Sequence, residues 1–532
     1  MGFAVAAADM AARIGLVDLM NRQVPWDPRQ CKVSPGIRFL ALVISCLVDP
    51  LALYRLEEFY ADLDCEVLFG PGRMARDFND DAIGRALVKL FESQVGQTYA
   101  HLCRQAVEAL SLPPTDSVHF DTTTITLYGD YPGQTAGSLP TFGYNKDGHP
   151  ECKQLVAGVV ARHDGIPLDV DVCDGNMDDP TWSRDATLSL GHTLDLNVKD
   201  QVLFVADSKL LRHETVADLC DANIRFVSRL PNTFGLVSTT KAAAATKTTA
   251  WETLGPLSAR SWATHYRIWE TSGTLGEQSV RLVVVHSSAL EAKAIHQETL
   301  RLERDAAQLD QALRRWEHRQ FACRDDAQNA WDAWCQTSTV RRAAWCVTGE
   351  VEMTTSSESP VWVVKAAQGE RATTQWDQER FRRSTFIVVS NDSRRSAREL
   401  VEAYKTQFVV EQDHAVVKGP LTIAPLFLKD TRKIMAYVYV VYIALLLWQC
   451  MQAVMRQNQA RLGISLPYPN KALQPAPTTK RLKEILTPIQ VIHWYDATGR
   501  LQRSRSELSI LERQALLLLG MDSRRFAQIP SG

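Results

Sequence analysis

The chain has 532 residues, of which 45% are hydrophobic and 23% charged, and its formal net charge is −2. This length exceeds one ordinary core and predicts two to four domains. The near-neutral charge excludes a protein that binds nucleic acid through its global charge, so a DNA-binding protein of this composition must concentrate basic residues locally. The eleven cysteines form no Cys-x2-Cys pair, which argues against structural zinc and a disulfide scaffold and favours reduced, buried thiols.

Residues 1–112 are predicted to be helical. Apolar residues recur at three-to-four spacing in GIRFLALVISCLV and in DDAIGRALVKLFESQVGQ. Pro113 and Pro114 then end this region. The N-terminus carries acidic residues early and has no basic leader, so it does not resemble a signal peptide.

From Ser117 the pattern changes to short strands alternating with helices. Three strands are predicted first, in SVHFDTTTITLYG, CKQLVAGVVARHDG and IPLDVDVCDG. A capped helix, DDPTWSRDATLSLGHTL, precedes the apolar strand QVLFVADSKLL, which is followed by the helix HETVADLCDAN and the strand IRFVSRLP. This order is that of a ribonuclease-H-like α/β core, in which the first and fourth strands are neighbours.

Residues 232–383 interrupt this pattern and are predicted to be a β-rich insertion domain. Apolar residues at helical spacing predict a helical hairpin over about 287–343. The strand STFIVVSN, at 384–391, resumes the core, and one long helix is expected over 393–419, ended by Gly419. The tryptophans of the insertion are expected to pack its core, with stacking on an unpaired base as the alternative.

The segment from Ile434 to Met455 is long and apolar enough to resemble a membrane-spanning helix. Gln449 and Gln452 interrupt it and no second such segment exists, so a buried core helix is expected rather than a transmembrane helix. A membrane protein remains the alternative. Residues 464–480 read as a linker before a small helical tail.

Three carboxylates are the candidate catalytic and metal-binding residues. Asp121 lies within an otherwise apolar strand, where a lone carboxylate is costly unless it is paired or binds a metal. Asp207 ends the second apolar strand, and Glu411 on the helix 393–419 could complete the pocket. Carboxylate oxygens suit Mg²⁺ or Mn²⁺, and two such ions support phosphoryl displacement.

Polar residues share one face of that predicted helix. Tyr404, Gln407, Glu411 and Lys418 have offsets of 0, 3, 7 and 14, which fall within an arc of roughly 60°. Between Arg380 and Lys433 there are eleven Lys or Arg and six Asp or Glu, including Arg394 and Arg395. This strip could neutralise phosphates, although a solvated charged helix is the simpler alternative.

These motifs resemble the insertion-sequence DDE transposases, in particular the superfamily with the signature Tyr-x2-Arg-x3-Glu-x6-Lys. The chain has Tyr404-x2-Gln407-x3-Glu411-x6-Lys418, HFDTTTITLYG is similar to the first-aspartate motif, and LFVADSKLL resembles the second. The separation of Asp207 and Glu411 (411 − 207 = 204 positions) fits the branch with a long β-rich insertion.

The resemblance implies which residues contact DNA. Lys418 and Tyr404 are expected to contact the DNA backbone, and Gln407 stands where the family has an arginine. Glutamine donates hydrogen bonds but carries no charge, so Lys405 could compensate for the weaker contact. Arg394 and Arg395 are expected to contribute to the same DNA-binding surface.

The predicted domains are residues 1–112 (helical, DNA-binding), 115–231 and 384–463 (the two parts of the core), 232–383 (insertion) and 464–532 (linker and helical tail). The resemblance implies Mg²⁺-dependent cleavage at element ends and strand transfer into target DNA by two metal ions, with Mn²⁺ as a substitute. It also implies recognition of inverted repeats, a homodimer assembled on double-stranded DNA, no membrane association, and a bacterial cytoplasmic, nucleoid-associated location. The alternatives are a ribonuclease-H-like DNA nuclease and a transposase-derived DNA-binding protein without cleavage activity.

Overall fold

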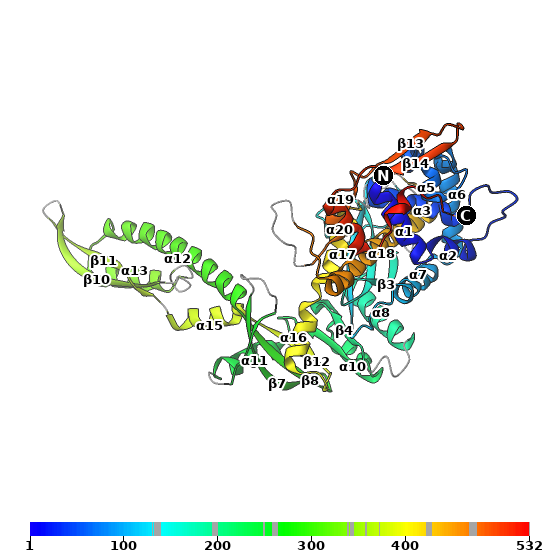
Figure 1. Cartoon of the computed structure of the whole chain (residues 1–532). Helices are drawn as coiled ribbons and strands as arrows, with labels where there is room; N and C mark the ends of the chain where they lie inside the picture. Colours follow the sequence, from blue (N-terminus) through cyan, green and yellow to red (C-terminus); the bar gives the residue numbers. More distant parts are fainter. Residues whose placement is uncertain are drawn as a thin grey trace. The chain divides into compact units, whose positions relative to one another are not determined.

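The computed structural model describes the chain except for residues 130, 132–139, 194–200, 248–249, 258–263, 338–339, 341–344, 357–358, 372, 422–427, 468–475 and 531–532. The described residues form a mixed α/β protein with two compact units (Figure 1). The first unit comprises Met1–Ser228 and Ala403–Gly532, and the second comprises Arg229–Glu402.

The N-terminal region is helical, as predicted. Its α-helices are α1 (Gly2–Arg13), α2 (Leu16–Gln23), α3 (Pro35–Val48), α4 (Leu56–Ala61), α5 (Cys65–Phe69), α6 (Asp80–Glu92) and α7 (Val95–Ala109), with short 3₁₀ turns η1 (Leu53–Arg55) and η2 (Ala75–Phe78). Helix α6 begins at Asn79, whose side chain accepts from the backbone N–H of Ala82. This cap satisfies one of the N–H groups that a helix start leaves without a helical partner.

Five strands form the sheet of the first unit: β1 (Ser117–Leu127), β2 (Lys153–Arg162), β3 (Pro167–Asp174), β4 (Leu203–Ala206) and β5 (Phe226–Arg229). Their order is β3-β2-β1-β4-β5. The first three strands are antiparallel, whereas β4 is parallel to β1 and β5 is parallel to β4. The prediction that the strands preceding Asp207 and containing Asp121 are neighbours is therefore confirmed.

Helices cover both faces of this sheet. Consecutive strand residues point to opposite faces. Thr122 pairs with Gly158, which lies against Trp182 of α8 (Asp179–Thr193). Asp121 is on the other face and lies near His414 of α17 (Phe408–Lys418). One strand thus supplies side chains to two helical layers. The helix α10 (His213–Asp221) links β4 and β5, as predicted.

Helix α18 (Thr431–Leu462) is the central core helix of the first unit. By length and composition it could cross a membrane, but 94% of its apolar window is buried inside the fold. It packs against α1, α3, α6, α7, α17, α19, α20 and β3. The hydroxyl of Tyr439 donates to the carbonyl of Val170 at 3.0 Å. The prediction of a buried core helix is confirmed.

The C-terminal region contains a hairpin that was not predicted. Between α19 (Thr479–Leu486) and α20 (Ile510–Leu519), strands β13 (Val491–Tyr495) and β14 (Leu501–Arg505) pair antiparallel, and η4 (Ser523–Phe526) follows. Asp496 accepts backbone N–H bonds from Thr498 and Arg500, and Gly499 has φ +76°. These turn interactions favour a hairpin, so the prediction of a purely helical tail is wrong.

The second unit contains two sheets. Strands β6 (Glu252–Pro256), β7 (His265–Leu275), β8 (Gln278–Ser287) and β12 (Thr385–Ser390) are antiparallel, in the order β12-β8-β7-β6, with α11 (Gly235–Ala245) and α15 (Thr373–Ser384) nearby. The smaller sheet has the order β10-β11-β9, from β10 (Trp345–Ser356), β11 (Ser359–Arg371) and β9 (Gln320–Phe321).

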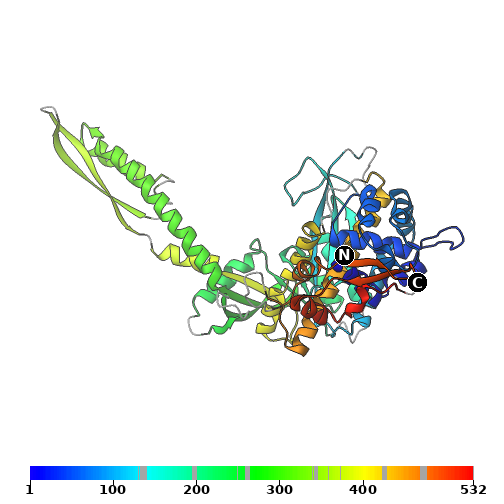
Figure 2. The ribbon, with the colours of Figure 1, turned by 45° about the horizontal axis from the view of Figure 1, so that its top comes forward.

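The long helix α12 (Ser288–Glu317) follows β8 directly and lies beside β10 and β11 in both views (Figures 1 and 2). Trp316 of α12 meets Trp331 and Trp334 of α13 (Arg324–Cys335), with ring centroids 5.3 and 5.6 Å apart. These helices lie in the range predicted for a helical hairpin. The aromatic cluster forms a small core, and Trp362, one of the tryptophans expected to pack the insertion, lies against it.

The predicted helix over 393–419 is interrupted. Helix α16 (Ala397–Lys405) ends before a turn at Thr406 and Gln407, after which α17 begins. Backbone bonds there run three residues back, from Gln407 to Tyr404 and from Val410 to Gln407. The expectation that Tyr404 shares one continuous helical face with Glu411 is therefore wrong. At this break, the side chains of Thr406 and Gln407 contact β1.

Candidate active site

Asp121 lies in the middle of the sheet, on β1. Its Oδ1 accepts from the backbone N–H of Thr122 at 2.8 Å, and its Oδ2 lies 3.6 Å from Nε2 of His414. Burial raises the pKa of Asp121, and the negative charge of Asp179 raises it further, whereas the nearby Lys146 lowers it. Positive charge near Asp121 therefore favours the ionised form of this carboxylate.

Asp207 follows β4 directly. Its Oδ1 accepts from the backbone N–H of Lys209 at 2.9 Å, which caps the 3₁₀ turn η3 (Ser208–Leu210). Its carbonyl accepts from Oγ of Ser228 at 2.7 Å, on β5. Burial raises the pKa of Asp207, and so does the negative charge of Asp121. These bonds fix the aspartate at the end of its strand.

Glu411 lies in the first turn of α17, where a carboxylate interacts favourably with the helix dipole. Its side chain is exposed. The pKa of Glu411 is raised by burial and then by the charges of Asp121 and Asp207. All three predicted carboxylates are thus close enough to repel one another, although Asp207 and Glu411 lie 204 positions apart (411 − 207).

The donor set at this site fits a divalent cation, because hard carboxylate oxygens are the ligands that Mg²⁺ and Mn²⁺ prefer. Mutual repulsion among three carboxylates favours binding of positive charge. Among the residues that the structure describes, however, no group of three or more His, Cys, Asp or Glu side chains is arranged so that it could hold a metal ion. The carboxylates are electrostatically coupled but not gathered into a finished metal site.

Gln407 is buried, with 8% of its surface exposed. Its Oε1 lies 3.2 Å from Nδ1 of His119, and its Nε2 donates to the carbonyl of Phe120 at 3.0 Å. Burial lowers the pKa of His119 to about 4, so the imidazole is neutral near pH 7 and Nδ1 donates to Gln407. In this structure the side chain therefore connects α17 to β1, and its predicted DNA contact stays a prediction.

Lys418 ends α17 and is 30% exposed. Its Nζ lies 2.6 Å from Oδ1 of Asp147. Both residues line a cavity of about 230 Å³ together with Thr124, Ile125, Thr126, Tyr128 and His149. A DNA phosphate that binds Lys418 would have to compete with Asp147. Tyr404 and Lys405, at the end of α16, are half-buried.

Arg394 and Arg395 belong to the second unit. Arg394 is exposed, and its backbone N–H donates to Oδ1 of Asp392 at 2.8 Å. Arg395 is half-buried, and its Nη1 lies 2.5 Å from Oδ2 of Asp392. Their predicted role in DNA binding stays a prediction.

The structure also brings residues to the carboxylates that the sequence reasoning did not select. These residues are Asp179, which lies in the predicted capped helix DDPTWSRDATLSLGHTL, and two lysines, Lys146 and Lys209. Nζ of Lys146 lies 2.9 Å and Nζ of Lys209 lies 2.5 Å from Oδ2 of Asp179. The only sequence signal was position: Lys209 follows Asp207 by two residues, and Asp179 begins a helix.

His414 is a second residue that sequence reasoning missed. It lies three residues after Glu411 and is 7% exposed, and neither ring nitrogen has a hydrogen-bond partner. Burial, followed by the charges of Lys146 and Lys418, lowers its pKa to about 3. A neutral imidazole therefore lies beside Asp121 in this structure.

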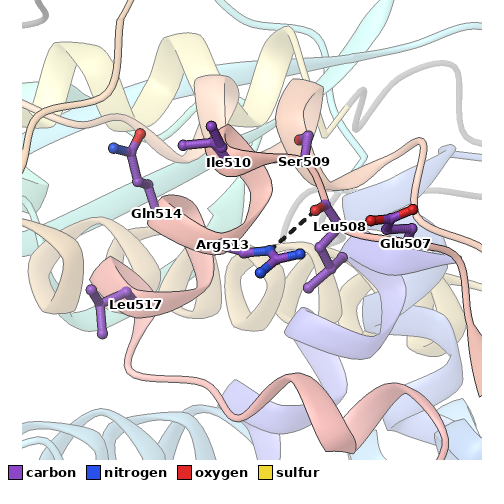
Figure 3. A pocket seen from close by; sticks show the side chains of 7 residues that line it. All are labelled: Glu507, Leu508, Ser509, Ile510, Arg513, Gln514 and Leu517. Atoms are coloured by element: carbon purple, nitrogen blue, oxygen red, sulfur yellow. Dashed lines mark hydrogen bonds between the residues drawn. The ribbon is translucent and has the colours of Figure 1, made fainter.

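A separate hollow of about 470 Å³ lies in the C-terminal region. It is lined by Glu507, Leu508, Ser509, Ile510, Arg513, Gln514 and Leu517 (Figure 3). Arg513 donates to the carbonyl of Leu508 at 3.1 Å. None of the predicted site residues lines it, so its size does not make it the active site.

Comparisons with known families identify the family of the chain. Residues 4–104 match the family described as a domain of unknown function, DUF4277. No curated protein matches the chain. Residues 115–447, more than half of the chain, match the family described as the transposase DDE domain. This match spans β1, β4 and α17, which carry the three carboxylates. The chain belongs to the DDE transposase family, as the resemblance of its motifs predicted.

Proposed function

We propose that the protein catalyses metal-dependent cleavage of DNA at insertion-sequence ends and transfer of the freed strand into target DNA. The observation that carries this proposal is the electrostatic coupling of Asp121, Asp207 and Glu411. Bound cations offset the mutual repulsion of three carboxylates in a partly buried site, so the cluster favours metal binding. Membership of the DDE transposase family supports DNA as the substrate.

Asp121, Asp207 and Glu411 would hold two Mg²⁺ ions, or Mn²⁺ in their place. When bound, the metal activates a water or a 3′-hydroxyl and stabilises the leaving oxygen of the phosphodiester. The protein itself fixes two carboxylates on neighbouring strands and brings the third on α17. Lys418, Lys405, Tyr404 and Gln407, with Arg394 and Arg395, are proposed to bind the DNA backbone.

The architecture supports this function. The antiparallel strands β3, β2 and β1, followed by the parallel strands β4 and β5, are compatible with a ribonuclease-H-like core, in which the first and fourth strands are neighbours. We propose that residues 115–231 and 384–463 form this core and that residues 232–383 are an insertion domain. The helices of residues 1–112 would bind the element ends, and two copies would assemble on DNA.

The experiment uses labelled duplex DNA that carries the inverted repeats flanking the gene. The full-length protein is incubated with this DNA and Mg²⁺, in parallel with Asp121→Asn, Asp207→Asn and Glu411→Gln. These substitutions keep size and remove charge. The matched control is Glu484→Gln. Glu484 lies on α19, its side chain is 46% exposed, and it pairs with Arg481.

Each of the three variants is expected to bind the ends and to lose cleavage by about a thousandfold or more, whereas Glu484→Gln cuts like the unmodified protein. Cleavage without joined products would favour the nuclease over the transposase. Binding without cleavage by the unmodified protein would favour the DNA-binding protein. Full cleavage by any one of the three variants would remove that residue from the proposed site.

A further inference from the structure

The side chain of Asp179 joins β1 to two lysines at the edge of the carboxylate site. Its Oδ1 accepts from Oγ1 of Thr122 at 2.6 Å, one residue from Asp121. Its Oδ2 lies 2.9 Å from Nζ of Lys146 and 2.5 Å from Nζ of Lys209. Two cations thus share one anion, and this cluster carries one more positive than negative charge.

Lys146 uses all its hydrogen bonds inside the protein. Nζ donates to the carbonyl and to Oγ1 of Thr122, both at 2.8 Å, and pairs with Asp179. An ammonium group has three N–H bonds, so these three contacts saturate it. Its side chain is 22% exposed. Lys146 therefore braces Asp179 against β1 and is not placed to bind a ligand.

Lys209 differs from Lys146 in exposure and in hydrogen bonding. Its side chain is 48% exposed, and the contact that fixes its ammonium group is the one to Asp179. Among the residues that the structure describes, Asp179 is the acceptor for this ammonium group, so two of its three N–H bonds can reach an external acceptor. A lysine ammonium group is positively charged near pH 7.

The backbone places this cation beside a proposed metal ligand. The N–H of Lys209 donates to Oδ1 of Asp207, and its side chain reaches Asp179 on the first turn of α8. The exposed ammonium group of Lys209 therefore lies at the edge of the carboxylates. The chemical group that complements such a cation next to a phosphodiester-cleaving site is a phosphate oxygen.

We propose that Lys209 binds a backbone phosphate of the DNA strand that enters the carboxylate site, and that Asp179 is the positioning residue that holds Lys209 there. The inference rests on the proposed function and adds a substrate contact to it. Lys146 and Thr122 fix Asp179 to β1, so the lysine is oriented before DNA binds. Because Lys209 follows Asp207 by two residues, the phosphate that it binds would lie close to Asp207.

The test measures the affinity of the full-length protein for duplex DNA over a range of salt concentrations, and the cleavage rate with Mg²⁺. The variants are Lys209→Ala, Lys209→Arg and Asp179→Asn. The control is Lys480→Ala, an exposed lysine on α19. Loss of one phosphate contact lowers the slope of log affinity against log salt by about 0.9.

For Lys209→Ala we expect that smaller slope and at least about tenfold weaker binding of DNA, because a hydrogen bond to a charged group is lost. Lys209→Arg keeps the charge and is expected to retain the slope. Asp179→Asn leaves Lys209 charged but no longer held in position. This variant is expected to keep the salt slope of DNA binding and to cleave more slowly, with a larger change in kcat than in KM. Lys480→Ala is expected to change neither quantity.

An unchanged slope and affinity in Lys209→Ala would overturn the inference. So would tighter binding of Mn²⁺ by Lys209→Ala without a change in DNA affinity, because the lysine would then serve only to neutralise the carboxylates. The proposed function fails separately, if the unmodified protein with Mg²⁺ does not cut the ends. Binding to duplex DNA still reports on Lys209 in that case.

Discussion

His119 and Gln407 are 288 positions apart and meet in the interior of the first unit, with Nδ1 and Oε1 separated by 3.2 Å. His119 precedes Asp121 by two residues on β1, and Gln407 precedes Glu411 by four at the start of α17. One buried polar contact therefore connects the segments that carry two of the three carboxylates. The glutamine that departs from the family signature has a structural partner in this chain.

Replacing Gln407 tests that role. Gln407→Ala leaves the imidazole N–H of His119 and the carbonyl of Phe120 without partners, and a buried polar group left unpaired costs about 1–3 kcal/mol. Gln407→Arg buries a charge and is expected to destabilise the protein at least as much. The free energy of unfolding is measured for both, and for His119→Ala with and without Gln407→Ala. Strictly additive effects in this cycle would contradict a direct coupling.

The ion pair of Lys418 and Asp147 predicts a gain of DNA affinity. Asp147 holds Nζ of Lys418 at 2.6 Å, so a phosphate must displace it. A partly exposed pair stabilises by up to about 1 kcal/mol, so Asp147→Asn is expected to tighten DNA binding by up to about fivefold.

Lys418→Ala is expected to weaken DNA binding, and the double variant with Asp147→Asn should bind no more tightly than Lys418→Ala alone. DNA affinity at low and high salt reports both effects. Tighter binding by the double variant than by Lys418→Ala would show that Asp147 acts through another residue.

Helix α8 lies so close to the sheet that one methyl group added at Gly158 is expected to destabilise the protein. A Cβ at Gly158 would lie 2.0 Å from Cε2 of Trp182, and Nε1 of that ring is held by Asp171 at 3.0 Å. Gly158→Ala is therefore expected to lower the free energy of unfolding by about 1–3 kcal/mol.

The double variant Gly158→Ala with Trp182→Leu should lose less stability than the sum of the two single variants, because the smaller leucine leaves room for the added methyl group. Gly235→Ala is the control, since a Cβ there meets nothing within 4 Å. Thermal unfolding checks the prediction, and an unchanged transition in Gly158→Ala would refute the packing argument.

Asp169 predicts a dependence of stability on pH. Burial, followed by the charge of the neighbouring Asp171, raises its pKa to about 6 from the ordinary value of 3.8. Between these values the folded state binds more protons than the unfolded state, so this residue makes stability fall as pH rises through that window. Asp169→Asn is expected to raise the unfolding temperature at pH 7.5 and to have almost no effect near pH 3.5. An equal effect at both pH values would exclude the carboxylate as the cause.

The sequence allowed the strands and their neighbours to be predicted because the signals were local. The β-branched run of β1, the apolar run of β4 and the buried helix α18 each specify their own structure. The prediction that the segments carrying Asp121 and Asp207 lie together followed from strand order alone, and the pairing of β1 with β4 confirms it.

The errors arose where distant contacts override local propensity. The helix over 393–419 has no Gly or Pro at its break, and the interruption coincides with contacts of Thr406 and Gln407 to His119. Asp179 reads as a helix cap in sequence, but Lys146 and Lys209 reach it from two other segments. No periodicity or spacing reports such convergence of side chains.

The placement of α18 has a consequence for synthesis of the protein. The first unit is built from two separate stretches of chain, and its central helix lies in the later stretch. At about 5–20 residues per second, the nascent N-terminal helices wait roughly ten seconds or longer for α18, while the second unit emerges whole. A polypeptide that ends prematurely within the second unit carries both aspartates but lacks Glu411 and the helix that completes the core. We expect such a fragment to be unstable, because the apolar faces that pack on α18 are then exposed to water.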